Sequence, residues 1–222
     1  MRVSKTRKDP PADFREHGEG VLHKHPEVFV LIVESDPVAV ERALVAGELT
    51  CPACAGELRP WSSARNRVVR EERRETTVAP RRSRCSSCKK THVLLPDRCL
   101  LRRRDALVSI GGALLDKAAG LGRRRIGRRL GIHPDTVRGW LRRFARRAEH
   151  WRVTCWAWAH ALDASLSPIA PAGSVFADAL SALGLAMATA TRLLGPRPGW
   201  GWVAMLSSGE LLANTSSPSP GA

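Results

Sequence analysis

The 222-residue sequence has no long run of strongly apolar residues. A membrane-spanning helix needs about 20 of them, and the most apolar window, residues 175–194, is mainly alanine and includes Asp178 and Arg192. Residues 1–20 lack the apolar segment of a secretory signal peptide. We therefore expect a cytoplasmic protein that does not act at a membrane.

The motifs of common enzyme classes are also missing. The sequence has no Walker A loop, no GxSxG nucleophile and no HExxH metal motif. The acids Asp163, Asp178 and Glu210 are far apart in a segment rich in Ala, Pro and Trp, whereas a two-metal site needs clustered carboxylates. We expect no enzymatic activity and no small-molecule substrate.

Lysine is scarce, because 30 of the 36 basic residues are arginine. The net charge of +15 is also localised: residues 102–147 carry fourteen basic and three acidic residues, whereas residues 1–58 carry seven basic and ten acidic ones. Arginine binds phosphate and guanine with two hydrogen bonds at once. One contiguous basic block of this kind indicates a polyanionic partner.

Two CxxC pairs are separated by 30 residues. Cysteines stay reduced in the cytoplasm, where paired CxxC motifs indicate metal rather than disulfides. Four thiolates complete a closed tetrahedral shell, which is typical of structural zinc. A disulfide or free thiols are the alternatives, and His92 is a possible substitute ligand that we interpret as a strand residue. The predicted zinc ligands are Cys51, Cys54, Cys85 and Cys88.

Short elements are predicted on either side of the first CxxC pair. The apolar run 28–33 favours a buried strand, and Asp36-Pro37 favours the start of a helix over 38–49, with Val40, Leu44 and Val45 on one face. Further short strands are predicted at 58–61, 67–71, 76–78 and 92–95.

Helical periodicity begins near residue 104. Helices are predicted over 106–119, 123–130 and 134–151, and a further helix over 175–194. An extension of the third helix toward 162 is an alternative.

Residues 123–142 fit a helix-turn-helix position by position: Gly127 is small where two helices cross, Gly131 allows a positive φ, and Pro134 occupies a first turn. The expected core positions are Ile126, Leu130, Ile132, Val137 and Trp140.

The remaining positions of this unit are polar and predict an interface with double-stranded DNA. Thr136, Arg138 and Arg142 lie on the exposed side of the third helix, where they are expected to reach base edges in the major groove. Further groove and phosphate contacts are expected from His133, Arg143 and Arg146. Phosphate contacts from the preceding helix are expected from Arg123, Arg124, Arg125, Arg128 and Arg129.

The combination of CPAC, RPW, RCSSC and THVLLP with GRRRIGRRLG and TVRGWLRRFARRAE resembles a bacterial family catalogued as a domain of unknown function. The resemblance covers roughly residues 28–194. Members of that family are described as helix-turn-helix proteins and linked with transposable elements. The resemblance implies DNA binding beside a transposase, and it implies no catalytic residues.

The predicted fold class is α+β: a small zinc ribbon of strands, followed by a mainly helical, homeodomain-like helix-turn-helix and C-terminal helices. The expected function is DNA recognition without a catalytic domain of its own, in the nucleoid, with a transposase or a second copy of the chain as further partners. A chromosomal transcription regulator and a zinc-ribbon adaptor that docks on another protein remain the alternatives.

The expected segments are a disordered tail 1–20, a strand-helix lead-in 21–50, a zinc ribbon 51–98, a helix-turn-helix domain 99–150, Ala/Trp-rich helices 151–206 and a flexible tail 207–222.

Overall fold

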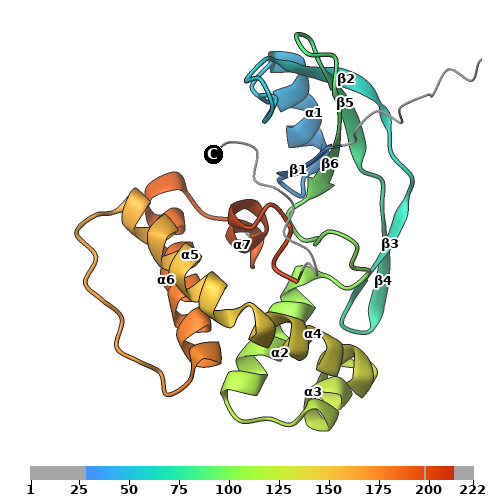
Figure 1. Cartoon of the computed structure of the whole chain (residues 1–222). Coiled ribbons are helices and arrows are strands. Elements are labelled where there is room, and N and C mark those ends of the chain that lie inside the picture. The colour runs from blue at the N-terminus through green and yellow to red at the C-terminus, as the bar shows by residue number, and fades with distance from the viewer. Residues whose placement is uncertain (1–28, 198, 213–222) are drawn as a thin grey trace, which may run out of the picture.

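A computed structural model describes residues 29–197 and 199–212 of the chain, so the predicted tail 1–20 lies outside the described residues. A β-sheet and α1 form one end of the molecule, and the remaining helices form the other (Figure 1). The predicted α+β class is confirmed.

The sheet combines strands from distant parts of the chain, in the order β1-β6-β5-β2. β1 (Phe29–Val33) runs parallel to β6 (Thr91–Pro96), and the other pairs are antiparallel. β5 (Arg81–Cys85), which the sequence analysis does not predict, lies between β6 and β2 (Leu58–Ser63).

Helix α1 (Pro37–Ala46) contributes to a small core beside this sheet. Asp36 caps it by accepting a hydrogen bond from the Val38 amide at 2.9 Å. Val40 and Leu44 are buried with Leu58, Leu94 and the neighbouring cysteines. Val45, which is predicted on one face with Val40 and Leu44, is instead 64% exposed. The helix ends before residue 49 because Gly47 takes a left-handed conformation.

The hairpin of β3 (Arg67–Glu71) and β4 (Arg74–Val78) forms a second, separate sheet. It extends from the main sheet toward α2 and α4 (Figure 1). Val69 and Val78 are buried in the helical core, and the Arg70 amide donates to the Arg104 carbonyl at 2.6 Å. The packing therefore crosses the expected boundary between residues 98 and 99.

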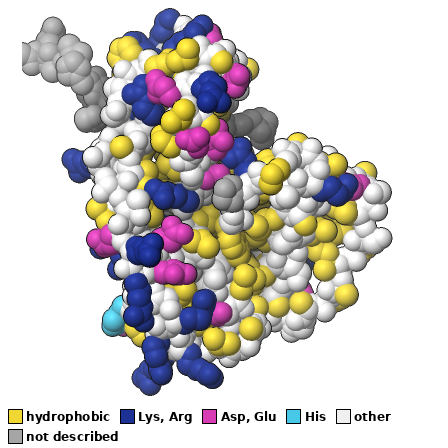
Figure 2. All heavy atoms as spheres, turned by 180° about the vertical axis from the view of Figure 1, so that it is seen from behind, with side chains coloured by type: hydrophobic (Ala, Val, Ile, Leu, Met, Phe, Trp, Pro, Cys, Tyr) yellow, Lys and Arg dark blue, Asp and Glu magenta, His cyan; other side chains and the backbone are white. Residues whose placement is uncertain are grey.

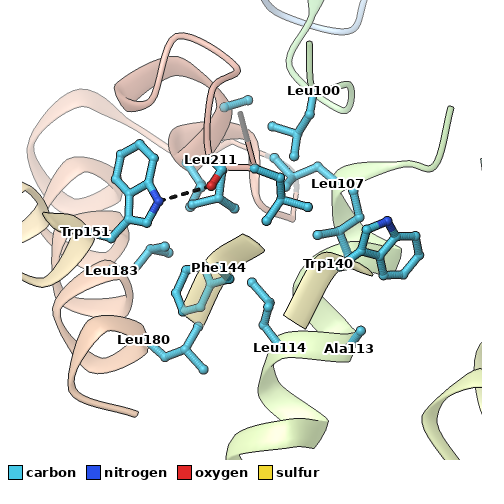
Figure 3. Close-up of a cluster of buried hydrophobic side chains, with 14 of the residues drawn as sticks. Leu100, Leu107, Ala113, Leu114, Trp140, Phe144, Trp151, Leu180, Leu183 and Leu211 are labelled. Atoms are coloured by element: carbon cyan, nitrogen blue, oxygen red, sulfur yellow. Dashed lines mark hydrogen bonds between the residues drawn. The ribbon is translucent and has the colours of Figure 1, made fainter. Parts of the chain in front are cut away.

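The helical core begins with α2 (Leu107–Ala118), α3 (Arg123–Leu130) and α4 (Pro134–Arg146). Leu107, Leu114, Trp140 and Phe144 meet at its centre (Figure 3). The third helix does not continue through residue 151, because the chain leaves helical geometry at Arg147 and begins α5 (Ala148–Leu162).

The C-terminal segment completes the same core. Helix α6 (Val175–Leu194) packs side by side with α5, and α7 (Gly201–Leu206) follows. Trp151 is buried and donates its Nε1–H to the Leu211 carbonyl at 3.1 Å (Figure 3). Leu211 and Leu212 are fully buried. The prediction of a flexible tail is therefore wrong for residues 207–212, and residues 213–222 lie outside the described part.

Four successive carbonyls of this segment accept hydrogen bonds from the helix-turn-helix region. Those of Gly209 and Glu210 accept from the Leu101 amide and the Arg147 side chain. The Leu212 carbonyl accepts from the Arg103 side chain at 2.6 Å, and the Leu211 carbonyl accepts from Trp151, as described above.

Among the described residues, none of the helices combines the length and apolar character needed to cross a membrane.

Candidate nucleic-acid interface and metal centre

The two CxxC pairs come together at one edge of the main sheet. All four sulfur atoms lie within 4.8 Å of one another. Cys51 Sγ is 3.7 Å from Cys88 Sγ, and Cys54 Sγ is 3.5 Å from Cys85 Sγ. A tetrahedral zinc ion with Zn–S bonds near 2.3 Å requires sulfur–sulfur edges of about 3.8 Å. The four side chains therefore fit a metal ion of this size.

Two tight turns hold these sulfurs. After Cys51, the Ala55 amide donates to the Cys51 carbonyl at 2.8 Å, and Ala55 takes a positive φ of 56°. In the second turn, the Cys85 amide donates to the Lys90 carbonyl at 2.9 Å, and Lys89 has a φ of 62°. Strand pairing joins the turns, because Leu58 in β2 lies opposite Cys85 in β5. The sheet register thus sets the distance between the pairs.

The electrostatics of this cluster also favour a cation. Burial raises the pKa of Cys85, but backbone N–H groups of Cys88 and Ser87 donate to its sulfur and lower that pKa to about 6. The Lys90 N–H lowers the pKa of Cys88, yet burial and the neighbouring thiols outweigh it and raise that pKa to about 11. Four sulfurs this close do not all ionise without a compensating charge, which a divalent metal supplies.

His92 lies beneath the cluster rather than in it. It belongs to β6, is fully buried, and places Nε2 3.4 Å from Cys51 Sγ. Burial lowers the pKa of this imidazole, with a smaller contribution from Lys90. A neutral ring with its proton on Nε2 would donate to the Cys51 sulfur, a contact of the kind that orients metal ligands. The sequence analysis did not assign this contact.

The helix-turn-helix has the stereochemistry that its residues predict. All five expected core side chains, from Ile126 to Trp140, are buried. Gly131 has φ 67° and ψ 29°. A Cβ on Gly127 would lie 2.6 Å from the Ile132 carbonyl oxygen, so this position has no room for a side chain. His133 caps α4 through its Nδ1, which accepts from the Asp135 amide at 3.3 Å.

The predicted contact residues lie on the outside of this unit. Arg123, Arg124, Arg125 and Arg128 are exposed on α3. Figure 2 shows Lys and Arg side chains gathered at the end of the molecule where α3 lies. On α4, His133, Arg138, Arg142 and Arg146 are exposed, whereas Thr136 and Arg143 are half-buried.

Two of these arginines already have acidic partners. Arg129 forms an ion pair with Asp116 of α2 at 2.6 Å, which links α3 to α2. Arg138 lies 3.4 Å from Asp135, one turn earlier on α4. The side chains of Arg138 and Asp135 are both more than half exposed, so water screens their attraction and Arg138 can exchange this partner for another.

The base-reading candidates share one hollow of about 520 Å³ with residues that the sequence analysis missed. Thr136, Arg138 and Arg142 line one wall, on α4. The turn before α2 also lines the hollow, through Arg102, Arg103 and Arg104. The run of three arginines within the most basic block of the chain is the signal that could have identified this turn.

Two acids of the C-terminal segment, Asp163 and Asp178, have local roles in the structure. Asp163 accepts from Ser165 and forms an ion pair with Arg192, and Asp178 accepts from the Ala172 amide. Within residues 29–197 and 199–212, the four cysteines are the only group of three or more His, Cys, Asp or Glu side chains placed to share a metal ion.

Comparisons with known families agree with this arrangement. Residues 51–120 match the model of a domain of unknown function (DUF6431), and residues 111–152 match the model of a homeodomain-like domain. The first match confirms the resemblance to a domain-of-unknown-function family. The second covers α3 and α4 and most of α2, and it points to DNA binding. No curated protein and no solved structure matches the chain.

Proposed function

We propose that this chain, in which a DUF6431 segment leads into a homeodomain-like helix-turn-helix, recognises double-stranded DNA and carries no catalytic domain of its own. The observation that supports this most directly is the exposed arginine surface of α3 and α4 on a unit whose core positions are all buried. Buried packing fixes the two helices, so the arginines are presented on a rigid frame.

In this proposal α4 enters the major groove. Arg138 and Arg142 are four residues apart and project from the same side of the helix, with Thr136 close by, so these three would meet base edges. Arg123, Arg124, Arg125 and Arg128 would contact phosphates from α3, and His133, Arg143 and Arg146 would add contacts along α4. Arg129 would contribute only if it exchanges its ion pair with Asp116.

The four cysteines would hold a structural zinc ion in this proposal. Sulfur would fill all four ligand positions, so no coordination site would be left for a substrate or water. The ion would fix the turns at the ends of β2 and β5 and thereby the sheet from which the β3–β4 hairpin extends. We retain a ribbon over 51–98 and a helix-turn-helix over 99–150 as functional units, although their packing overlaps at this hairpin.

We further propose that the protein acts in the nucleoid beside a transposase, which the family resemblance supports, or together with a second copy of itself. A chromosomal transcription regulator would use the same DNA chemistry. An adaptor role is favoured by one observation: Val38 and Val45 on α1 are 63% and 64% exposed and line an open apolar hollow with Pro37 and Ala46.

Selection of duplexes from a random pool, followed by binding measurements at several salt concentrations, tests the proposal. Arg124→Ala and Arg128→Ala should weaken binding to all sequences about equally and each flatten the log–log salt slope by about one unit. Arg138→Ala and Arg142→Ala should relax specificity at one position each, at a cost of about 1–3 kcal/mol on the selected site.

The reading of bases by α4 fails if the Arg138→Ala and Arg142→Ala variants keep the wild-type ratio between selected and random DNA. DNA recognition as a whole fails if the metal-loaded wild-type chain enriches no sequence and binds duplexes with no salt dependence.

A further inference from the structure

The hollow between α4 and the turn before α2 is strongly basic. Seven arginines and two aspartates line it. Both aspartates already have partners: Asp105 binds Arg70 at 2.7 Å, and Asp135 lies 3.4 Å from Arg138. The lining therefore has a large excess of positive charge within one concave surface, where the surrounding protein strengthens its field.

Two arginines of the turn, Arg102 and Arg104, project this charge into solvent. Arg102 is exposed and has no ion pair or hydrogen-bond partner in the described part of the chain. The Arg104 side chain pairs with Glu75 at 3.2 Å, and both of these side chains are more than half exposed. An exposed pair of this kind contributes little to stability, so an anion can replace Glu75 at small cost.

The turn itself is held rigidly. Its backbone joins β3, because the Arg70 amide donates to the Arg104 carbonyl at 2.6 Å and the Ala106 amide donates to the Arg70 carbonyl at 2.7 Å. The Arg67 side chain donates to the Arg103 carbonyl at 2.9 Å. The backbone of this turn is thus held against β3 before any ligand binds, which reduces the entropy lost on binding.

We propose that Arg102 and Arg104 form a clamp for a phosphodiester of the DNA backbone, beside the groove that α4 enters. This inference rests on the proposed function. A helix in the major groove, which is about 12 Å wide, has a phosphate backbone along each side. The turn lines the same hollow as Arg138 and Arg142 of α4. Guanidinium groups there would bind a phosphodiester through two parallel hydrogen bonds.

The clamp also gives the β3–β4 hairpin a role. The hairpin holds the turn through Arg70 and Asp105, and its tip reaches the helix-turn-helix, where a Cβ on Gly131 would lie 2.8 Å from Arg73 Cγ. The ribbon would thereby set the position of a DNA contact without touching DNA itself.

The experiment compares two double variants of equal net charge on a duplex selected by the wild-type chain. Arg102→Ala with Arg104→Ala removes the clamp, and Arg42→Ala with Arg65→Ala removes two exposed arginines outside the hollow. In the clamp variant, the log–log salt slope should be flatter by about two units. Its affinities for selected and for random DNA should fall by the same factor. The control should change the slope by much less. Arg102→Lys with Arg104→Lys should recover most of the slope, because the charge is kept.

A second measurement leaves the protein unchanged. Neutral methylphosphonates replace the phosphates of the selected duplex one at a time. At one or two positions this replacement should weaken binding by the wild-type chain but leave the affinity of the clamp variant unchanged. The inference is overturned if the clamp variant, with normal melting temperature and metal content, keeps the wild-type slope or only matches the control. DNA recognition by α3 and α4 survives that result, whereas absence of duplex binding by the wild-type chain rejects the proposed function itself.

Discussion

The carboxylate of Asp105, which is 5% exposed, lies 2.7 Å from the guanidinium of Arg70 and joins the β3–β4 hairpin to the start of α2. Burial raises the pKa of this carboxyl, and Arg70 opposes the shift through its charge and a hydrogen bond from Nε. A hairpin of the cysteine ribbon and the helix-turn-helix thus share one largely buried ion pair.

Replacing Arg70 by Met should destabilise the protein by about 1–3 kcal/mol at neutral pH, because a buried carboxylate loses its partner. The raised folded-state pKa means that the folded protein binds the proton more tightly than the unfolded chain. The stability lost on Arg70→Met should therefore become smaller as pH falls toward about 4, because a protonated Asp105 no longer needs the charge of Arg70. Denaturant unfolding at several pH values measures this. Adding Asp105→Asn should restore most of the stability, and a double variant as unstable as Arg70→Met would contradict the explanation.

Two glycines of the helix-turn-helix should resist substitution, for different reasons. Gly127→Ala introduces a Cβ 2.6 Å from a backbone oxygen and should cost about 1–3 kcal/mol through overpacking. Gly131→Val forces a β-branched residue into the left-handed region and should cost at least as much. Thermal unfolding measures both losses.

Gly184 offers a matched control in the middle of α6. A Cβ there meets no atom within 4 Å among the described residues. Gly184→Ala should therefore stabilise the protein by about 0.5–1 kcal/mol, because alanine loses less conformational freedom in a helix. If Gly184→Ala destabilised the protein, glycine substitutions in its helices would be harmful in general. The losses at Gly127 and Gly131 would then not be evidence for a close contact or for a left-handed backbone.

Metal content should follow the cysteine geometry. The purified chain should hold one zinc ion, and Cys51→Ser or Cys85→Ser should reduce this below half an equivalent and lower the melting temperature. Cys99→Ser and Cys155→Ser should keep the metal, because both thiols are buried elsewhere; burial raises the pKa of Cys155 to about 12. Metal analysis and thermal unfolding with and without chelator provide the measurements. Equal zinc in all four variants would reject the site.

The link between α5 and α6 should weaken in acid. Hydrogen bonds from Ser165 and Arg192 lower the pKa of Asp163 to about 2. A folded-state pKa below the usual value gives stability that is complete above about pH 4 and is lost as pH falls toward 2. Melting temperatures of the wild type and Asp163→Asn should therefore differ above pH 4 and converge in acid. Taking the difference removes the acid loss of metal that both proteins share. A constant difference down to pH 2 would be inconsistent with this assignment.

The helix-turn-helix was predictable because its constraints are local. The turn needs a left-handed residue and two helices need a close crossing, and Gly131 and Gly127 meet those needs within a few positions. The cysteine spacing is equally informative, since four sulfurs and a preferred tetrahedron leave few arrangements.

The missed features depend on distant parts of the chain. Strand β5 has the sequence RRSRC, without the apolar alternation of a strand, and it forms because β2 and β6 bond to its two edges. Its inward residue Ser83 is polar yet fully buried. The parallel pairing of β1 with β6 likewise depends on residues far apart in the sequence. The run Arg102–Arg104 is visible in the sequence, but its place beside α4 in one hollow is not.

The return of residues 209–212 to the helix-turn-helix bears on when the protein can fold. Arg103 binds the Leu212 carbonyl across 109 positions, and Trp151 binds the Leu211 carbonyl across 60. During synthesis, the helices that present the arginines leave the ribosome well before the segment that closes their core. Contacts this distant in sequence slow folding. Completion of the helical core around the helix-turn-helix must therefore wait until residues 209–212 have been translated.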